Sequence, residues 1–542
     1  MTKKHLTRRN FLKTAAAGSA AAGAASSVFG AAPSRVLGAN ERIKIGIIGP
    51  GGRVAGYSDA MLEGHMRHLC GSSKEGKAFR RKFDVEITAV CDVWDYRTER
   101  AAAMAEKESA HAVEAATNPE DPKDSKAPLK GGAFKVTKHN RDYRKLLDDK
   151  NVDVVLIGTP DHWHARQTID AAAAGKDVYC EKPMTHTIDE ARQVCEAIAK
   201  HKRVMQVGVQ SMSDPRWRAA SELIKAGKIG HVMQAHTSYY RNSAVGQWRY
   251  YKLTEDMTPK SIDWKMFLGT EFGLAPDQPF DRAVFQQWRC YWDFGGGMYT
   301  DLFVHQLSHL IAAIGVRFPR RVVGAGGLYM EYDGRDVPDV ATVVADYDEG
   351  CQVIITATMC NDYPIEEIIR GHTGTIKFLA GRDDGFKLMP NYPANRPGKP
   401  AYPGEEPEGT QHVKTGSPPP GTDETVQHWM NFLECCQSRN HETNNTPELG
   451  YAAIATVNLG TQSYRDGKAY FWDSKNNRSS LADTSWANAW EKRSKSRGKP
   501  NQVAGWKAGD TGSLLEPPDY QKLAGPWMDG KDPAAISGGG GK

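Results

Sequence analysis

The chain has 542 residues. A single hydrophobic core rarely supports a chain of this length, so we expect at least two domains. Its 40% hydrophobic and 25% charged residues are ordinary for a soluble globular protein. The net charge of +5 equals the five cations of an acid-free start, so the rest of the chain is neutral and indicates neither a nucleic-acid nor an acidic-membrane partner. These cations are Lys3, Lys4, Arg8, Arg9 and Lys13.

The start has the layout of an export signal. The basic stretch Thr7–Lys13 precedes a small-residue apolar run from Ala15 to Val28, with cleavage options near Ala31. The arginine pair resembles a twin-arginine signal, and the apolar run is too short and weakly hydrophobic to span a bilayer well. We therefore expect residues 1–32 to be a signal peptide and the mature protein to be periplasmic, without an integral membrane span. The alternative is an ordinary N-terminal helix.

The first predicted strand, residues 43–49, is nearly all apolar and leads directly into a glycine turn, Gly49-Pro50-Gly51-Gly52-Arg53. A strand followed by a glycine turn and a helix brings backbone N–H groups close to a pyrophosphate. The spacing departs from G-x-G-x-x-G, because position 54 is Val and the next glycine is Gly56. We expect Gly49, Gly51, Gly52 and Arg53 to bind a dinucleotide.

A second apolar strand, residues 85–90, closes on Cys91-Asp92. An acid there can accept hydrogen bonds from both adenosine ribose hydroxyls and repel a 2′-phosphate, so Asp92 favours NAD over NADP. The acid usually follows about 20 residues after the glycines. Here the gap from Gly49 to Asp92 is longer, and we expect the surplus, residues 70–83, to be an inserted loop. Alternatively, Asp92 is a strand-end turn residue.

Further strands at residues 152–157, 178–180 and 204–209 alternate with helices at 100–108, 143–147, 165–174 and 188–201, while 118–132 is a polar loop. This alternation predicts a parallel sheet with right-handed crossovers. Residues after the strands would lie at its cofactor edge: Thr159, Pro160, His162, Trp163, His164 and Gln210. Two histidines could ligate a metal, but no nearby carboxylate or cysteine completes a set. The nine cysteines are scattered, so we expect neither a metal site nor a disulfide framework.

Glu181-Lys182-Pro183 follows the short strand 178–180. Pro183 ends that strand, because proline has no N–H for a sheet ladder. Lys182 is then held at the carboxyl edge of the sheet, where open α/β folds bind ligands. A cation there can hydrogen-bond a substrate hydroxyl and ease its deprotonation. The alternative is a strand-end lysine in a surface ion pair.

From Asp214 the pattern changes. A helix at 217–226 precedes long alternating strands at 232–240, 321–332, 341–347, 352–359, 366–371 and 375–379, which predict a mostly antiparallel sheet and an α+β domain. Between its first two strands lies a long connection, 242–319. If Met298–Ile314 is helical, Asp301 and His305 share one face. Alternatively, His305 packs within the helix and Asp301 caps it.

The C-terminal part is less patterned. Residues 384–425 are rich in proline and glycine and predict an irregular loop, while helices are expected at 426–437 and 448–464. After Asp473 the chain is polar, with Trp486, Trp490, Trp506 and Trp527 as isolated anchors.

With these pieces placed, the sequence resembles the Gfo/Idh/MocA family of NAD(P)-dependent oxidoreductases, which act mainly on sugars and cyclitols. The resemblance spans roughly Arg42 to Asp473 and depends on Gly49–Arg53, Thr159–His164, Glu181–Pro183 and Gly295–His305. It implies an N-terminal Rossmann domain at 40–210 and a C-terminal α+β domain with an open-faced sheet at 211–473, followed by an extension at 474–542. It also implies homo-oligomerisation through that sheet.

By the same resemblance, Lys182, Asp301 and His305 match the family's catalytic trio. His305 would be the general acid/base, Lys182 would stabilise the alkoxide, and Asp301 would tune the other two. Glu181 and Lys182 would also lie against the NAD. Ser308 departs from the family, which often has an aspartate there.

Three functions remain open from sequence. The first is oxidation of a sugar or polyol hydroxyl with tightly held, recycled NAD. The second is a glycosidase that oxidises a sugar hydroxyl transiently and eliminates the aglycone. The third is a cofactor-stabilised scaffold without activity. Aromatic and arginine residues that could bind sugar, or instead belong to the core or an interface, are Trp248, Arg249, Arg289, Tyr291 and Trp292.

Overall fold

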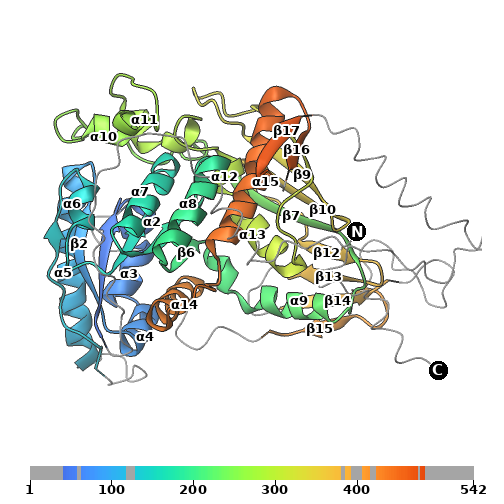
Figure 1. The fold of residues 1–542 in the computed structure, drawn as a ribbon, viewed down its shortest axis with the longest axis horizontal. Coiled ribbons are helices and arrows are strands. Elements are labelled where there is room, and N and C mark those ends of the chain that lie inside the picture. Colours follow the sequence, from blue (N-terminus) through green and yellow to red (C-terminus); the bar gives the residue numbers. More distant parts are fainter. Residues whose placement is uncertain are drawn as a thin grey trace, which may run out of the picture. The chain divides into compact units, whose positions relative to one another are not determined.

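The structure is a computed structural model that describes residues 41–57, 63–117, 128–379, 385–391, 406–415, 423–473 and 476–481. The expected signal peptide, the tryptophans expected after Asp473, and most of the expected loop at 118–132 lie outside these residues. The chain divides into two compact units (Figure 1). The first comprises Met1–Gly208, Glu255–Phe280 and Thr425–Tyr451, and the second comprises Val209–Thr254, Asp281–Glu424 and Ala452–Lys542.

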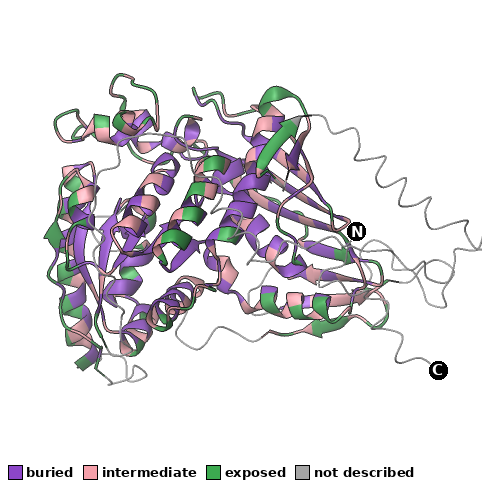
Figure 2. Ribbon diagram, in the orientation of Figure 1, coloured by how far each residue is buried: buried purple, intermediate pink, exposed green. Residues whose placement is uncertain are grey.

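The first unit contains a six-stranded sheet in the order β3-β2-β1-β4-β5-β6, with every pairing parallel. The strands are β1 (Ile43–Ile48), β2 (Val85–Cys91), β3 (Thr137–Lys138), β4 (Val154–Ile157), β5 (Asp177–Glu181) and β6 (Met205–Gly208). This order is that of doubly wound dinucleotide-binding folds, so the predicted parallel sheet is confirmed. The four central strands are almost wholly buried, as expected of strands covered on both faces (Figure 2).

Helices of the first unit come from three separate parts of the chain. They are α2 (Gly52–Ala55), α3 (Gly64–Cys70), α4 (Lys74–Lys82), α5 (Asp95–Thr117), α6 (Tyr143–Leu147), α7 (Asp161–Ala173), α8 (Ile188–His201), α10 (Trp264–Leu268) and α14 (Glu424–Ser438). The expected inserted loop at 70–83 is wrong, because α4 occupies most of it. Ser73 caps α4 by accepting a hydrogen bond from the N–H of Gly76, and Phe79 buries one face of the helix.

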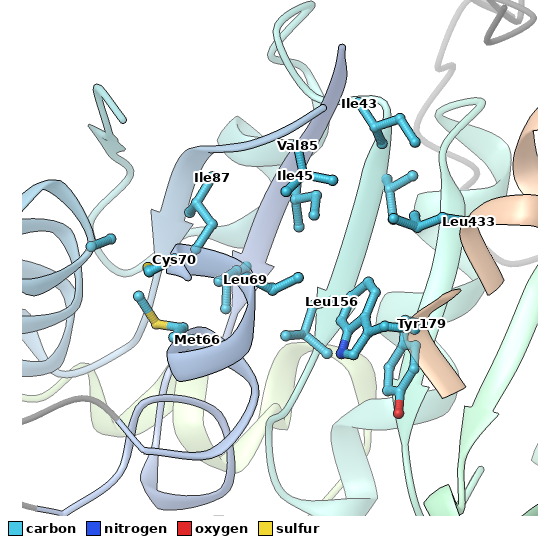
Figure 3. Packing of buried hydrophobic residues seen from close by; sticks show 14 of the residues in the cluster. Ile43, Ile45, Met66, Leu69, Cys70, Val85, Ile87, Leu156, Tyr179 and Leu433 are labelled. Carbon is cyan, nitrogen blue, oxygen red and sulfur yellow. The ribbon is translucent and has the colours of Figure 1, made fainter. Parts of the chain in front are cut away.

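The core of this unit joins the start of the chain to residues near its other end. Ile45, Ile87 and Leu156 from the sheet pack with Leu69 of α3 and Leu433 of α14 (Figure 3). The orange α14 lies beside the blue α4 in Figure 1, and Lys82 and Glu434 form an ion pair between them. The late segment is therefore an integral part of the dinucleotide-binding unit.

The second unit contains an eleven-stranded sheet in the order β15-β14-β13-β12-β7-β10-β9-β8-β16-β17, with β11 paired to β7. Its strands are β7 (Val232–Asn242), β8 (Arg321–Gly327), β9 (Val340–Tyr347), β10 (Cys351–Thr358), β11 (Cys360–Asn361), β12 (Ile368–Gly371), β13 (Gly374–Phe378), β14 (Phe386–Pro390), β15 (Gln411–Val413), β16 (Tyr470–Asp473) and β17 (Arg478–Leu481). Among the described strands of this second sheet, only the β7–β10 pairing is parallel, so the mostly antiparallel prediction is confirmed. The prediction of an irregular loop at 384–425 is wrong in part of its described residues, because β14 and β15 extend the sheet there.

The helices of the second unit include α9 (Pro215–Lys225), α11 (Arg282–Gln286), α12 (Met298–Asp301) and α13 (Phe303–Ile314), and α15 (Pro447–Asp466) is shared by both units. The single helix expected at 298–314 is therefore broken at Leu302. The N–H of His305 bonds to the carbonyl of Leu302, three residues back, so the register tightens at the junction. Asp301 and His305 consequently belong to different helices rather than to one face of one helix.

Among the described residues, no helix has the length and apolar character of a membrane span.

Candidate active site

The first candidate group lies at the carboxyl end of β5. The strand ends at the buried Glu181, and the half-buried Lys182 follows, joined to Pro183 by a cis peptide bond. The backbone N–H of Lys182 donates to Oε2 of Glu181 at 3.2 Å. Lys182 is therefore positioned by the backbone at the edge of the sheet where doubly wound folds bind their ligands.

Glu181 is held by two residues from other parts of the first unit. Its Oε1 lies 2.5 Å from Nε2 of His65 on α3 and 3.3 Å from Nε of Arg53. On the other side of the imidazole, the indole N–H of Trp429 donates to Nδ1 of His65 at 2.8 Å. Since an indole N–H can only donate, Nδ1 accepts, and the ring's proton lies on Nε2 and points to Glu181. His65 is thereby fixed as the neutral Nε2–H tautomer.

The charge of Glu181 is stabilised despite its burial. Burial alone would raise the pKa of this carboxyl, but the Arg53 charge, the His65 hydrogen bond and Lys182 together hold it well below its usual range. Glu181 is only 3% exposed and remains ionised. A buried carboxylate with these partners fixes the backbone from which Lys182 projects.

His164 connects the ends of β4 and β5. Its Nδ1 lies 2.6 Å from the carbonyl oxygen of Pro183 and its Nε2 lies 2.8 Å from that of Thr159. Burial lowers the pKa of His164, and a neutral imidazole has one N–H to donate. The ring therefore donates to one of these two carbonyls at a time and ties the Glu181–Pro183 turn to the neighbouring strand end.

The other residues of the histidine-tryptophan stretch face the interior. Pro160 precedes α7 as its N-cap. His162 Nε2 and Trp163 Nε1 both lie 2.8 Å from the carbonyl oxygen of Phe267, and both side chains are buried. The structure thus gives His162 and Trp163 a packing role against α10. In the described part of the chain, no group of three or more His, Cys, Asp or Glu side chains could hold a metal ion.

The glycine turn after β1 leaves room for a ligand. Gly49 has a φ of +76°, and a Cβ there would lie 2.7 Å from the backbone N of Thr159. Gly51 has an ordinary φ of −78°, and a Cβ there would meet only the guanidinium of Arg97, at 3.7 Å. Gly49 is thus required by the backbone, whereas Gly51 leaves an open cradle of the kind a pyrophosphate occupies. The helix after it, α2, is a single turn from Gly52.

Asp92 follows β2 at the same end of the sheet. Its Oδ1 accepts the backbone N–H of Trp94 at 2.9 Å, and its Oδ2 lies 4.0 Å from Arg97. Burial raises the pKa of Asp92, with Arg97 acting against that shift. The carboxylate keeps acceptor capacity toward a pair of ribose hydroxyls, so the turn and Asp92 fit NAD. Gln210 is buried and begins the 3-10 turn Gln210–Ser213 of the second unit.

The second unit holds the other two predicted catalytic residues. Asp301 is buried at the end of α12, and Nε of Arg289 donates to its Oδ1 at 2.8 Å. The Arg289 guanidinium also lies over the rings of Trp288 and Tyr251, at 4.2 and 6.0 Å from their centroids. Arg289 thus acts as the counter-charge of Asp301.

His305 lies in the first turn of α13 beside residues that the sequence analysis missed. Its ring centroid lies 5.8 Å from that of Tyr239 on β7. Nη2 of Arg241 donates to the hydroxyl of Tyr239 at 3.0 Å. Tyr239 and Arg241 are two residues apart on β7 and therefore share one face. The alternation predicted for 232–240 would have supplied this signal only if it had been continued by one residue.

Several residues expected near the sugar have structural partners. Trp248 is 1% exposed with a φ of +67°, which corrects the idea that it stacks on a sugar. Arg249 bonds to Asp333, Gln287 and Tyr291, while Trp292 lies under the guanidinium of Arg465. At the position where the sequence departs from the family, the Ser308 hydroxyl donates to the carbonyl of Val304.

Comparison with known proteins gives matches along most of the described chain. Residues 43–209 match the description "Oxidoreductase family, NAD-binding Rossmann fold", and residues 221–471 match "Oxidoreductase family, C-terminal alpha/beta domain", both of the Gfo/Idh/MocA family. The chain is 35% identical over 287 residues to scyllo-inositol 2-dehydrogenase (NAD(+)) of Bacillus subtilis, covering 49% of this chain and 71% of that one.

A second relative is levoglucosan dehydrogenase of Pseudarthrobacter phenanthrenivorans, 30% identical over 158 residues, which is 27% of this chain and 39% of that protein. Solved structures of levoglucosan dehydrogenase with NADH and levoglucosan and of an oxidoreductase domain protein from Kribbella flavida share the fold. Their TM-scores are 0.53 and 0.54 and their sequence identities 17% and 18%, in that order. Each match covers 79% of this chain, and the matches cover 99% and 98% of the two solved chains. The first unit is thus an NAD-binding Rossmann domain, and the chain belongs to the Gfo/Idh/MocA family of oxidoreductases.

Proposed function

We propose that the protein is an NAD-dependent oxidoreductase that oxidises a secondary hydroxyl of a sugar or polyol. The observation that carries this proposal is Lys182, fixed by Glu181 at the carboxyl edge of an NAD-binding sheet. The relatives support the substrate class, since they are named for levoglucosan and scyllo-inositol.

Three side chains carry the chemistry in this proposal. A sugar hydroxyl is a weak acid, so its oxidation needs a base and a cation close to the oxygen. His305 accepts the hydroxyl proton, and the Lys182 ammonium stabilises the negative charge that develops on the oxygen. Asp301, which accepts a hydrogen bond from Arg289, tunes Lys182 and His305.

The cofactor is proposed to be NAD, held by Gly51, Arg53 and Asp92. When bound, NAD supplies the acceptor for the hydride equivalent lost by the carbinol carbon. The Asp92 carboxylate favours NAD over NADP, because a 2′-phosphate would bring a second negative charge to it. We assign His164 and Glu181 to positioning Lys182, through the carbonyl of Pro183 and the N–H of Lys182.

The start of the chain supports a further proposal, that the protein is exported by the twin-arginine route and works in the periplasm. NAD is scarce there, so the cofactor is expected to be bound tightly before export. The second sheet carries exposed apolar side chains, including Met233 on β7 and Val323 on β8, which supports homo-oligomerisation through this sheet.

The test begins with the purified protein. We expect nicotinamide absorbance from bound cofactor, and reduction of added NAD by a polyol or sugar from a panel that includes inositols and anhydrosugars. Lys182→Ala and His305→Ala should still bind NAD and lose turnover. A protein without affinity for NAD, or variants with unchanged turnover, would contradict the proposal.

A further inference from the structure

Arg241, near the end of β7, is a half-buried guanidinium whose charge is not matched by an ion pair. Its hydrogen bond goes to the hydroxyl of Tyr239, and its guanidinium carbon lies 5.2 Å from the centroid of that ring. Among the residues that the structure describes, no carboxylate forms an ion pair with Arg241. A neutral phenol contributes a hydrogen bond and a π-face but does not cancel the charge.

The carboxylate that influences Arg241 electrostatically is already committed. Asp301 lowers the energy of the charged Arg241, yet its Oδ1 accepts from Arg289 at 2.8 Å. Asp301 thus accepts a hydrogen bond from Arg289, whereas Arg241 has no carboxylate at ion-pair distance among the described residues. Burial opposes the charge, but Tyr239 and Asp301 keep the pKa of Arg241 above its ordinary value.

Other arginines of the second unit show the usual pairing. Arg249 and Arg335 both contact Asp333, and Arg335 also pairs with Glu331, so two cations meet two anions. Half-buried charges are normally compensated in this way, because removing them from water is costly. Arg241 has no such ion pair among the described residues. It therefore differs from Arg249 and Arg335, and this difference indicates an anionic ligand.

The position of Arg241 relates this guanidinium to the proposed reaction at His305. Tyr239 contacts both the imidazole of His305 and the guanidinium of Arg241. A substrate whose hydroxyl lies at His305 would therefore have the Arg241 guanidinium close by, next to the ring of Tyr239. A planar carboxylate suits a guanidinium fork, which can donate two parallel hydrogen bonds.

We propose that Arg241 binds a carboxylate of the substrate, so that the sugar oxidised is a sugar acid, such as a uronic or aldonic acid. This inference depends on the proposed oxidoreductase function. The single guanidinium of Arg241 matches one carboxylate, whereas a phosphate monoester carries about −1.5 to −2 charges.

The test compares matched substrates with the NAD-loaded enzyme: glucuronate and gluconate against glucose, galacturonate against galactose, and glucose 6-phosphate as the phosphorylated member. We expect a higher kcat/KM for the acids. Arg241→Gln should lower kcat/KM for the acids about 10- to 100-fold, as loss of a charge-assisted hydrogen bond does, and change that for neutral sugars little. Arg370→Gln is the control, since Arg370 is an exposed arginine of the same sheet that bonds to Gln234.

Equal kcat/KM values for acids and neutral sugars, preference for the phosphate, or an unchanged acid preference in Arg241→Gln would overturn this inference while leaving the oxidoreductase function intact. If none of the panel is turned over, calorimetry of glucuronate and glucose binding to the NAD-loaded enzyme decides. Tighter binding of glucuronate that Arg241→Gln abolishes supports the inference, and its absence overturns it. Failure to bind NAD is the separate result that removes the proposed function itself.

Discussion

Trp429 follows His65 by 364 residues, and its indole N–H donates to Nδ1 of that histidine at 2.8 Å. This bond sets the tautomer of His65, which in turn donates to the carboxylate of Glu181. A residue of α14 thus determines how the backbone of Lys182 is held at the edge of the sheet.

Trp429→Phe should lower the free energy of unfolding by about 1–3 kcal/mol, because Nδ1 of the buried His65 loses its donor. Trp163→Phe is the matched control. It removes the same ring atoms and an indole N–H, but the carbonyl of Phe267 still accepts from His162. Urea denaturation of both variants measures the difference in the free energy of unfolding. Equal losses of stability would show that the bond to His65 contributes no more than the bond that Trp163 makes.

Glu181→Gln should destabilise the protein in a pH-dependent manner. The pKa of folded Glu181 is depressed, chiefly by Arg53 and His65 acting against burial, whereas an unfolded glutamate has a pKa of about 4.3. Its ionisation therefore stabilises the fold fully above about pH 5, and this contribution is lost as pH falls through the folded pKa. Denaturation curves from pH 3 to 7 should converge for wild type and variant toward low pH. Parallel curves would be inconsistent with a charged Glu181.

Gly51→Ala and Gly49→Ala should separate cofactor binding from folding. Residue 51 has an ordinary backbone conformation and space for a Cβ, so Gly51→Ala should fold normally and bind NAD at least about tenfold more weakly. Gly49 has a φ of +76° and no space, so Gly49→Ala should lower the melting temperature. Unaltered NAD affinity in a folded Gly51→Ala protein would show that the cradle holds something else.

Asp92→Ser should weaken NAD binding and reduce discrimination against NADP, because the variant lacks the charge that repels a 2′-phosphate. A change of about tenfold in the ratio of the two dissociation constants is expected from loss of hydrogen bonds to a charged group. The nearby Asp95→Ser is the control, since Asp95 pairs with Arg141 at the start of α5. Equal ratios in both variants would remove Asp92 from the cofactor site.

The parallel sheet and the Glu181–Pro183 turn could be predicted from sequence because both depend on neighbouring residues. An apolar run ends at Glu181, and Pro183 cannot continue the ladder. The break at Leu302 could not be predicted, because residues 298–314 contain neither proline nor glycine and the register change depends on tertiary packing.

The hydrogen bond between His65 and Trp429 could not be predicted from the sequence either, since no local pattern relates residues so far apart. The basic segment before β2 was predicted as a loop, yet Ser73 begins a helix there whose Phe79 is covered by the core. Arg241 was missed for another reason. It lies one residue beyond the predicted strand 232–240, and its lack of an ion pair among the described residues is visible only in the structure.

The central claim is that Lys182 and His305 act on one hydroxyl, and a double-mutant cycle on kcat tests it most directly. Groups that act as a unit show strongly non-additive losses, so the doubly substituted enzyme, Lys182→Ala with His305→Ala, should be about as slow as the slower single variant. Both single variants should still bind NAD. If the two losses in kcat instead multiply, as for independent sites, the two residues do not share a substrate hydroxyl and the account is contradicted.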